Sequence, residues 1–398
     1  MNQKTLLLTL IILISCLLPV GTDIYAPSLP AVASSFNISI HQAQLSMAIY
    51  MLSVSVSLFF YGALSEVYGR KKPLITGMVI LSIGSLICFY STGLTGLMIG
   101  RAIQGIGAGA CKLIGAMLKD GFDDNEMAKV TSYLHIAVGI IIPFAPAIGG
   151  VLQHLYHWHA SFMFITAYSL ICLSIIICLL KETSQHHHKD RIKIRYIVST
   201  YRTVLTNPLF LVYATCNLLT FGALFSWASA LPIVFQHTLG YSARNYGLVI
   251  FITSAMGCLL GSFSNTRLIK RLSHQTIIQT GWALVGLSGL FMLIGHSIAG
   301  TRATLILIPI FIFQYGTALV WPYTFIGAFK PFTKLAGYAS AMFAATQLFG
   351  GFALGALVAY LPDRNGVPLS VIFIAVAIIC LFIHHLFAKP LLAHYEEQ

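Results

Sequence analysis

Residues 21–30 read GTDIYAPSLP and lie at the far end of the first apolar segment of the chain. Asp23 stands within this segment, and by our reading of the spans it is the only one of the eleven Asp and Glu residues that does so. A carboxylate inside the apolar core of a membrane is costly, and such residues mark functional sites by default. The alternative is a carboxylate that has already reached the headgroups or the external water. Asp23 is therefore the first candidate site residue.

The composition indicates an integral membrane protein. Of the 398 residues, 57% are hydrophobic and only 9% are charged, with a mean hydropathy of +0.84. Soluble domains carry about 25% charged residues, so these few charges would not cover a water-exposed surface. The net charge is +12, but Lys and Arg fall in short loops between apolar runs, which indicates membrane topology and no nucleic-acid partner. The eight Cys residues lie in apolar segments without zinc-type spacing, so we expect no metal site and no structural disulfide.

Twelve apolar runs are long enough to cross the hydrocarbon core as helices, which takes about 20 residues. They predict an all-α polytopic membrane protein, because barrel strands would appear as shorter alternating segments. The expected spans are residues 5–27, 42–64, 73–91, 95–118, 128–152, 160–180, 208–235, 244–264, 275–296, 303–325, 336–361 and 368–388.

The distribution of Lys and Arg predicts the orientation of these spans. If both termini are cytoplasmic, eighteen of the 23 basic residues lie on the inner side and only three lie in outer loops. Loops on the cytoplasmic side of a membrane carry an excess of Lys and Arg. We therefore expect both termini in the cytoplasm.

The longest polar stretch between spans, residues 181–207, divides the spans into two sets of six. It predicts a six-helix bundle over residues 1–180, a cytoplasmic linker, and a second six-helix bundle over residues 208–398. Two pseudo-symmetric bundles of this kind are typical of transporters. The histidines at 186–188 could bind a metal, but no second ligand cluster accompanies them, so we interpret them as part of a solvated linker.

The loop after the second span reads GALSEVYGRKKPL over residues 62–74. Gly62 permits close helix approach, and Gly69 permits a tight turn. Glu66 could pair with Arg70 or lie against a positive helix N-terminus. The spacing favours a structured cytoplasmic latch over an ordinary basic loop.

The fourth span reads LMIGRAIQGIGAGACK over residues 97–112. Arg101 is a full charge in an apolar helix, with Gln104 one turn later. Lys112 follows Arg101 by close to three helical turns, so we expect both side chains on one face. Lys112 lies nearer the cytoplasmic end and can extend to the interface, whereas Arg101 has no such short route, which favours a functional role for Arg101.

The fifth span contains Pro143, Pro146, Gly149 and Gly150. Two prolines remove intrahelical hydrogen bonds and favour a bend, and the glycine pair permits close packing against another helix. We interpret this span as a hinge or a seal in a moving bundle; a static kink is the alternative.

Together these motifs resemble the major facilitator superfamily, in its twelve-span drug:proton antiporter group. Residues 62–74 resemble the loop signature G-x-L-x-D-R-x-G-R-[RK], with Glu66 and Val67 in place of the usual Asp and Arg. Arg101, Gln104 and Gly105 resemble the signature of span four. Residues 145–150 resemble the antiporter signature of span five, with Ala145 in place of a Gly, and residues 22–30 resemble the T-D-M-Y-L-P-x-[LM]-P of the Bcr/CflA branch of multidrug efflux transporters.

The resemblance implies roles for particular residues. Asp23 would carry the proton and face the substrate, and Arg101, with Gln104, would take part in proton coupling. It implies the proton gradient as energy source with no cofactor, and no catalytic residue. The implied partners are a small-molecule substrate, protons and the lipid bilayer of a bacterial-type inner membrane, with the chain acting as a monomer. The substrate cavity would draw on aromatic and amphipathic residues: Tyr25, Tyr50, Tyr133, Asn217, Trp227, Gln314, Tyr315, Trp321 and Gln347.

Several functions compete at this point. The first is proton-driven export of drugs or of a native metabolite, including an exporter dedicated to one compound such as a siderophore. Proton-coupled uptake of a nutrient is the alternative within transporters and predicts a selective polar pocket. A membrane enzyme is disfavoured because the loops offer no acid, base and nucleophile constellation. An ATP-driven pump is disfavoured because no G-x-x-x-x-G-K-[ST] occurs.

Overall fold

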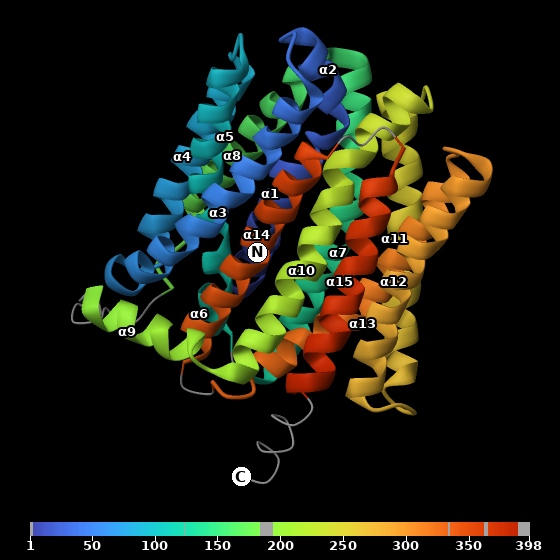
Figure 1. The fold of residues 1–398 in the computed structure, drawn as a ribbon. Helices are drawn as coiled ribbons and strands as arrows, with labels where there is room; N and C mark the ends of the chain where they lie inside the picture. Colours follow the sequence, from blue (N-terminus) through green and yellow to red (C-terminus); the bar gives the residue numbers. More distant parts are fainter. Residues whose placement is uncertain (1–2, 123, 184–193, 333–334, 362–364, 389–398) are drawn as a thin grey trace. The chain divides into compact units, whose positions relative to one another are not determined.

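The computed structural model describes residues 3–122, 124–183, 194–332, 335–361 and 365–388, and every regular element in these ranges is a helix (Figure 1). The first part of the chain forms α1 (Gln3–Asp23), η1 (Ala26–Ser28), α2 (Leu29–Ser35), α3 (Ile40–Tyr68), α4 (Lys71–Phe89), α5 (Leu94–Ala108), η2 (Gly109–Leu113), α6 (Ile114–Gly121), α7 (Asp124–Tyr156), α8 (His159–Leu179) and α9 (Ile194–Leu205). The second part forms α10 (Pro208–Ile233), η4 (Val234–Thr238), α11 (Ala243–Leu268), α12 (His274–Ala299), α13 (Thr304–Phe329), α14 (Ala336–Tyr360), α15 (Val367–Ile383) and η5 (His384–Ala388).

The helices have the length and composition of membrane spans. Within the described ranges, 11 helical segments are long and apolar enough to cross a membrane. The predicted fifth span appears as a shorter apolar stretch, Ile141–Tyr156, inside the 33-residue helix α7. The prediction of an all-α polytopic membrane protein is confirmed.

The chain divides into two compact units, residues 1–201 and 202–398. In the first unit, α5 packs against α3 and α4, α4 packs against α8, and α1 packs against α7 (Figure 1). In the second unit, α10 packs against α14, α12 packs against α13 and α15, and α11 packs against α13. The predicted linker, residues 181–207, contains the helix α9, and its histidines at 186–188 lie outside the described residues.

The end of the first span differs from the prediction of one continuous segment over residues 5–27. Helix α1 ends at Asp23, the chain turns, and the apolar segment continues through η1 and α2 to Ser35. Pro27 has no N–H to donate to the carbonyl of Asp23 four residues earlier, and Pro30 has none for Ala26. Asp23 therefore lies at a break in the helix, well inside the apolar segment.

The predicted common face of Arg101 and Lys112 is wrong. The side chain of Arg101 is fully buried, whereas Lys112 is exposed. After α5 the chain tightens into the 3₁₀ segment η2, Gly109–Leu113, which contains Lys112. A 3₁₀ helix turns by about 120° per residue instead of about 100°, so the face reached by Lys112 is rotated away.

Candidate functional site

Arg101 on α5 is the centre of a buried polar cluster. It is 0% exposed. Its Nη1 donates to the carbonyl oxygen of Gly21 at 2.8 Å and to Oε1 of Gln104 at 2.5 Å, and its Nε donates to the carbonyl oxygen of Ser46 at 3.3 Å. The guanidinium therefore joins α5 to the end of α1 and to α3.

Aromatic rings surround the guanidinium. Its central carbon lies 4.3 Å from the ring centroid of Tyr50, 5.1 Å from that of Tyr25 and 5.9 Å from that of Phe162. The hydroxyls of Tyr25 and Ser46 are 3.0 Å apart and share a hydrogen bond. A cation in contact with aromatic faces gains cation–π stabilisation that grows when water is excluded. Tyr25 and Tyr50, which we predicted in the substrate cavity, thus belong to the surroundings of Arg101.

Gln104 is held in place from its other side. Its Nε2 donates to Oγ of Ser85 on α4 at 2.8 Å, while its Oε1 accepts from Arg101. Both atoms of the amide are therefore occupied, which fixes its orientation. In contrast, Nη2 of Arg101 is buried and has no hydrogen-bond partner in the part of the chain that the structure describes. The Nη2 amino group of Arg101, with its two N–H bonds, thus remains without a partner among the described residues.

Asp23 lies beside this cluster without joining it. It is partly buried, and the ion pairs of the described residues include none between Asp23 and Arg101. The two are linked through the backbone, because Arg101 binds the carbonyl of Gly21, two residues before Asp23. The structure therefore brings Arg101 and Gln104 together, and in the part of the chain that it describes no cation pairs with the Asp23 carboxylate.

Gly149, in the predicted fifth span, packs directly against the break at the end of α1. A Cβ added at Gly149 on α7 would collide with the carbonyl oxygen of Ile24, the residue after Asp23. The same carbonyl accepts a hydrogen bond from Oγ of Ser161 at 3.3 Å. Helix α7 continues through Pro143 and Pro146, and both prolines are buried, as are Gly149 and Gly150. The close approach of α7 to the α1 break thus depends on a missing side chain.

The predicted cytoplasmic latch also includes a charged residue from outside its loop. Nη1 of Arg70 donates to Oγ of Ser65 at 2.7 Å and to Oε1 of Glu66 at 3.3 Å. Its Nε donates to Oδ2 of Asp120 at 2.9 Å, on α6. Of the two partners that we considered for Glu66, the structure shows the pair with Arg70. Gly62 lies one turn before Glu66 on the same helix, α3.

The second position that we considered for Glu66, against a helix N-terminus, is occupied by Glu182 of the predicted linker, at the start of α4. Its Oε1 accepts from the backbone N–H of Arg70 at 2.7 Å and its Oε2 accepts from that of Lys71 at 3.1 Å, where α4 begins. The preceding Gly69 has φ +79, and a Cβ there would collide with the Glu182 carboxylate. Sequence reasoning missed both Asp120 and Glu182. The only signal was that each is an acid close to the end of a span.

The other predicted cavity residues fall into two groups. Tyr133, on α7, is exposed. In the second unit, Asn217 and Trp227 are buried on α10, and Gln314 is buried on α13. Tyr315 and Trp321 on α13 and Gln347 on α14 are partly exposed.

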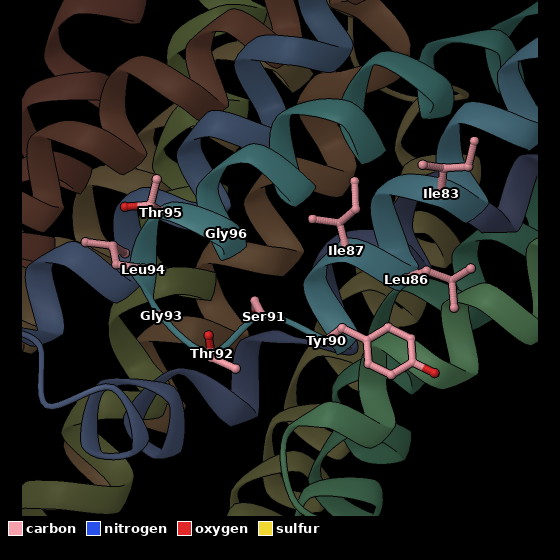
Figure 2. A pocket seen from close by; sticks show the side chains of 10 residues that line it. All are labelled: Ile83, Leu86, Ile87, Tyr90, Ser91, Thr92, Gly93, Leu94, Thr95 and Gly96. Atoms are coloured by element: carbon pink, nitrogen blue, oxygen red, sulfur yellow. The ribbon is translucent and has the colours of Figure 1, made fainter.

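A groove of about 620 Å³ lies where α4 ends and α5 begins (Figure 2). Figure 2 shows Ile83, Leu86, Ile87 and Tyr90 on one side, and on the other residues 91–93 of the connecting turn with residues 94–96 at the start of α5. None of the predicted site residues lines it. It therefore adds no group to the Arg101 cluster.

Comparisons with known proteins agree with the fold and the motifs. The chain is 28% identical over 383 residues to the multidrug resistance protein MdtL of Klebsiella pneumoniae (strain 342), covering 96% of this chain and 95% of that protein. It is 24% identical to the bicyclomycin resistance protein homolog of Haemophilus influenzae, covering 93% of each. It is 25% identical to multidrug resistance protein D of Escherichia coli (strain K12), covering 90% of each.

Solved structures match the whole fold at low sequence identity. A crystal structure of a D-xylose-proton symporter matches with a TM-score of 0.75 at 13% identity, covering 97% of this chain and 98% of that one. A crystal structure of the peptide transporter POT matches with a TM-score of 0.76 at 12% identity, covering 98% and 99%. These likenesses establish the fold alone.

The sequence profile described as the Major Facilitator Superfamily matches residues 11–330. The relatives named for multidrug and bicyclomycin resistance confirm the resemblance to the Bcr/CflA branch of efflux proteins. This chain is therefore a transporter rather than an enzyme, and it belongs to the Major Facilitator Superfamily.

Proposed function

We propose that this protein is a proton-coupled secondary transporter that exports small amphipathic molecules, drugs or a native metabolite, by alternating access. Its relatives carry names of multidrug resistance, which supports a small-molecule substrate and export. The positive-inside distribution of Lys and Arg supports an orientation with both termini cytoplasmic, and the bacterial relatives support an inner-membrane location. The chain would act as a monomer, driven by the proton gradient without a cofactor.

One observation carries the proposal: a fully buried arginine is fixed to the backbone beside a carboxylate that has no ion-pair partner among the residues the structure describes. Arg101 binds the carbonyl of Gly21, and Asp23 lies two residues later at the helix break. An aspartate neutralised by a permanent salt bridge could not exchange a proton readily. Asp23 is instead available for a proton or for a substrate, while Arg101 holds the turn in position.

Proton coupling follows if the two ligands of Asp23 exclude each other. A proton entering from outside binds the carboxylate and displaces the substrate, and its release to the cytoplasm restores the charge for the next substrate. Uphill export is then driven by proton entry. Because Gly149 packs against Ile24, a movement of the break at the end of α1 would also move α7. The Arg70 cluster holds α3, α4 and α6 together at the other end of the unit, as a latch on the cytoplasmic side.

Transport into everted membrane vesicles tests the proposal. Ethidium should accumulate in vesicles that contain the wild-type protein when a proton gradient is imposed, and dissipating the gradient should abolish accumulation. Asp23→Asn should remove this accumulation, because the amide cannot titrate. Glu126→Gln is the matched control, since Glu126 forms an exposed ion pair with Lys4 at 2.7 Å and should not affect coupling. Gradient-driven loss of ethidium from the vesicles would instead indicate uptake and would contradict export.

A further inference from the structure

The four tryptophans of the chain differ in what their indole N–H groups bind. Nε1 of Trp158 donates to Oγ of Ser35 at 3.2 Å, and Nε1 of Trp282 donates to Oγ1 of Thr220 at 3.2 Å. The Nε1 atoms of Trp227 and Trp321 are buried and have no hydrogen-bond partner among the described residues. Buried indole N–H groups usually find a partner, because an unsatisfied buried donor is costly.

Asn217 shows the same feature. Its side chain is 1% exposed, and its Nδ2 has no hydrogen-bond partner in the described ranges. Trp227, on the same helix α10, is 6% exposed. Trp321 is on α13, which packs against α10. Three N–H donor groups without a partner among the described residues therefore lie on two neighbouring helices of the second unit, and the family resemblance implied all three residues for the substrate cavity.

The helices of this unit offer no negative charge to accompany the donors. No Asp or Glu occurs in α10, α11, α12, α13, α14 or α15. A cationic ligand would find no counter-charge on these helices, and its positively charged group could not accept a hydrogen bond from an N–H group. A ligand with carbonyl, ether or hydroxyl oxygens would satisfy the donors.

We propose that Asn217, Trp227 and Trp321 donate hydrogen bonds to the substrate, and that the substrates include neutral amphipathic molecules rich in oxygen acceptors, besides cations that make no use of these donors. This inference rests on the proposed export function and adds the chemical class of its substrate. Asn217 and Trp227 are ten residues apart, which places them about 15 Å apart along the helix axis. An elongated molecule with acceptors at both ends would reach both; a compact one would use a single donor.

Two radiolabelled probes of similar size separate acceptor chemistry from charge. Colchicine is neutral and carries several ether and carbonyl oxygens, whereas tetraphenylphosphonium is a lipophilic cation with no hydrogen-bond acceptor. Equilibrium binding to the purified full-length protein gives a Kd for each probe. The ratio of the two Kd values cancels any general loss of folded protein in a variant.

The variants remove N–H donors and keep the shape of the side chain. Trp227→Phe and Trp321→Phe lose only the indole N–H and part of the ring, and Asn217→Leu loses the amide at similar volume. Each should raise the Kd of colchicine about five- to tenfold and leave that of tetraphenylphosphonium unchanged. Trp282→Phe is the matched control: its N–H already has a partner in Thr220, so the ratio of Kd values should stay at the wild-type value.

The outcomes distinguish the inference from the proposed function. Equal weakening of both probes in Trp227→Phe, or no weakening of colchicine in any of the three variants, would overturn the inference. Wild-type protein that binds and exports tetraphenylphosphonium but does not bind colchicine would also overturn it, while export would stand. If the wild type binds neither probe, export of amphipathic molecules fails and the inference fails with it.

Discussion

Replacing Gly149 with alanine tests whether α7 is held against the break in the first span. A Cβ built on Gly149 lies 2.7 Å from the carbonyl carbon of Ile24 and 3.0 Å from its Cα, and it collides with the carbonyl oxygen. All three are backbone atoms, so they cannot rotate aside as a flexible side chain would. The two segments must separate, and overpacking of this kind costs about 1–3 kcal/mol. We expect Gly149→Ala to unfold at a lower temperature than the wild type and to transport more slowly.

The matched control is on the same helix. Gly139 is also helical, and a Cβ there meets nothing within 4 Å. Gly139→Ala should therefore keep or raise the unfolding temperature, because alanine favours a helix over glycine by about 1 kcal/mol. Thermal unfolding in detergent and transport in proteoliposomes measure both effects. A Gly149→Ala protein that unfolds at the wild-type temperature and transports normally would refute the close contact and, with it, the role of span five as a seal.

Three further predictions concern other parts of the molecule. Arg101→Lys should lose most transport in vesicles, because an ammonium cannot reproduce a planar fork of donors to two backbone carbonyls; an Arg101→Ala protein that inserts and transports fully would contradict this. Glu182→Gln should lower the unfolding temperature through the loss of about 1 kcal/mol of helix-terminus stabilisation, whereas the same change at the exposed Glu126 should cost less; equal effects would contradict the prediction. Reporter fusions after Lys189 should be cytoplasmic and fusions near Gln236 external, and an external signal from Lys189 would overturn the orientation.

The local features of the site were predictable because they depend on neighbours along the chain. Arg101 and Gln104 are three residues apart on one helix, so their side chains meet. The pair of Glu66 and Arg70 follows from the same geometry at four residues. The break at Asp23 could also have been predicted: Pro27 removes the hydrogen bond that would have continued α1.

The remaining features depend on packing between segments that are far apart in the sequence. Ser85 reaches Gln104 from another helix, and Glu182 reaches the start of α4 from more than a hundred residues away. No periodicity or motif in one sequence specifies such partners. The predicted direction of the Lys112 side chain was wrong for a different reason. The chain changes from α-helix to a 3₁₀ segment at Gly109, and this change has no distinct sequence signal.

The central claim is that Asp23 carries the proton, and substrate-induced proton release tests it most directly. The purified protein in weakly buffered detergent solution is mixed with colchicine, and a pH-sensitive dye records protons released. The account predicts that the wild type releases protons on binding and that Asp23→Asn releases none while still binding this neutral probe, because the hydrogen-bond donors of the second unit remain. Equal proton release from the wild type and Asp23→Asn would contradict the account, since the proton would then come from another group.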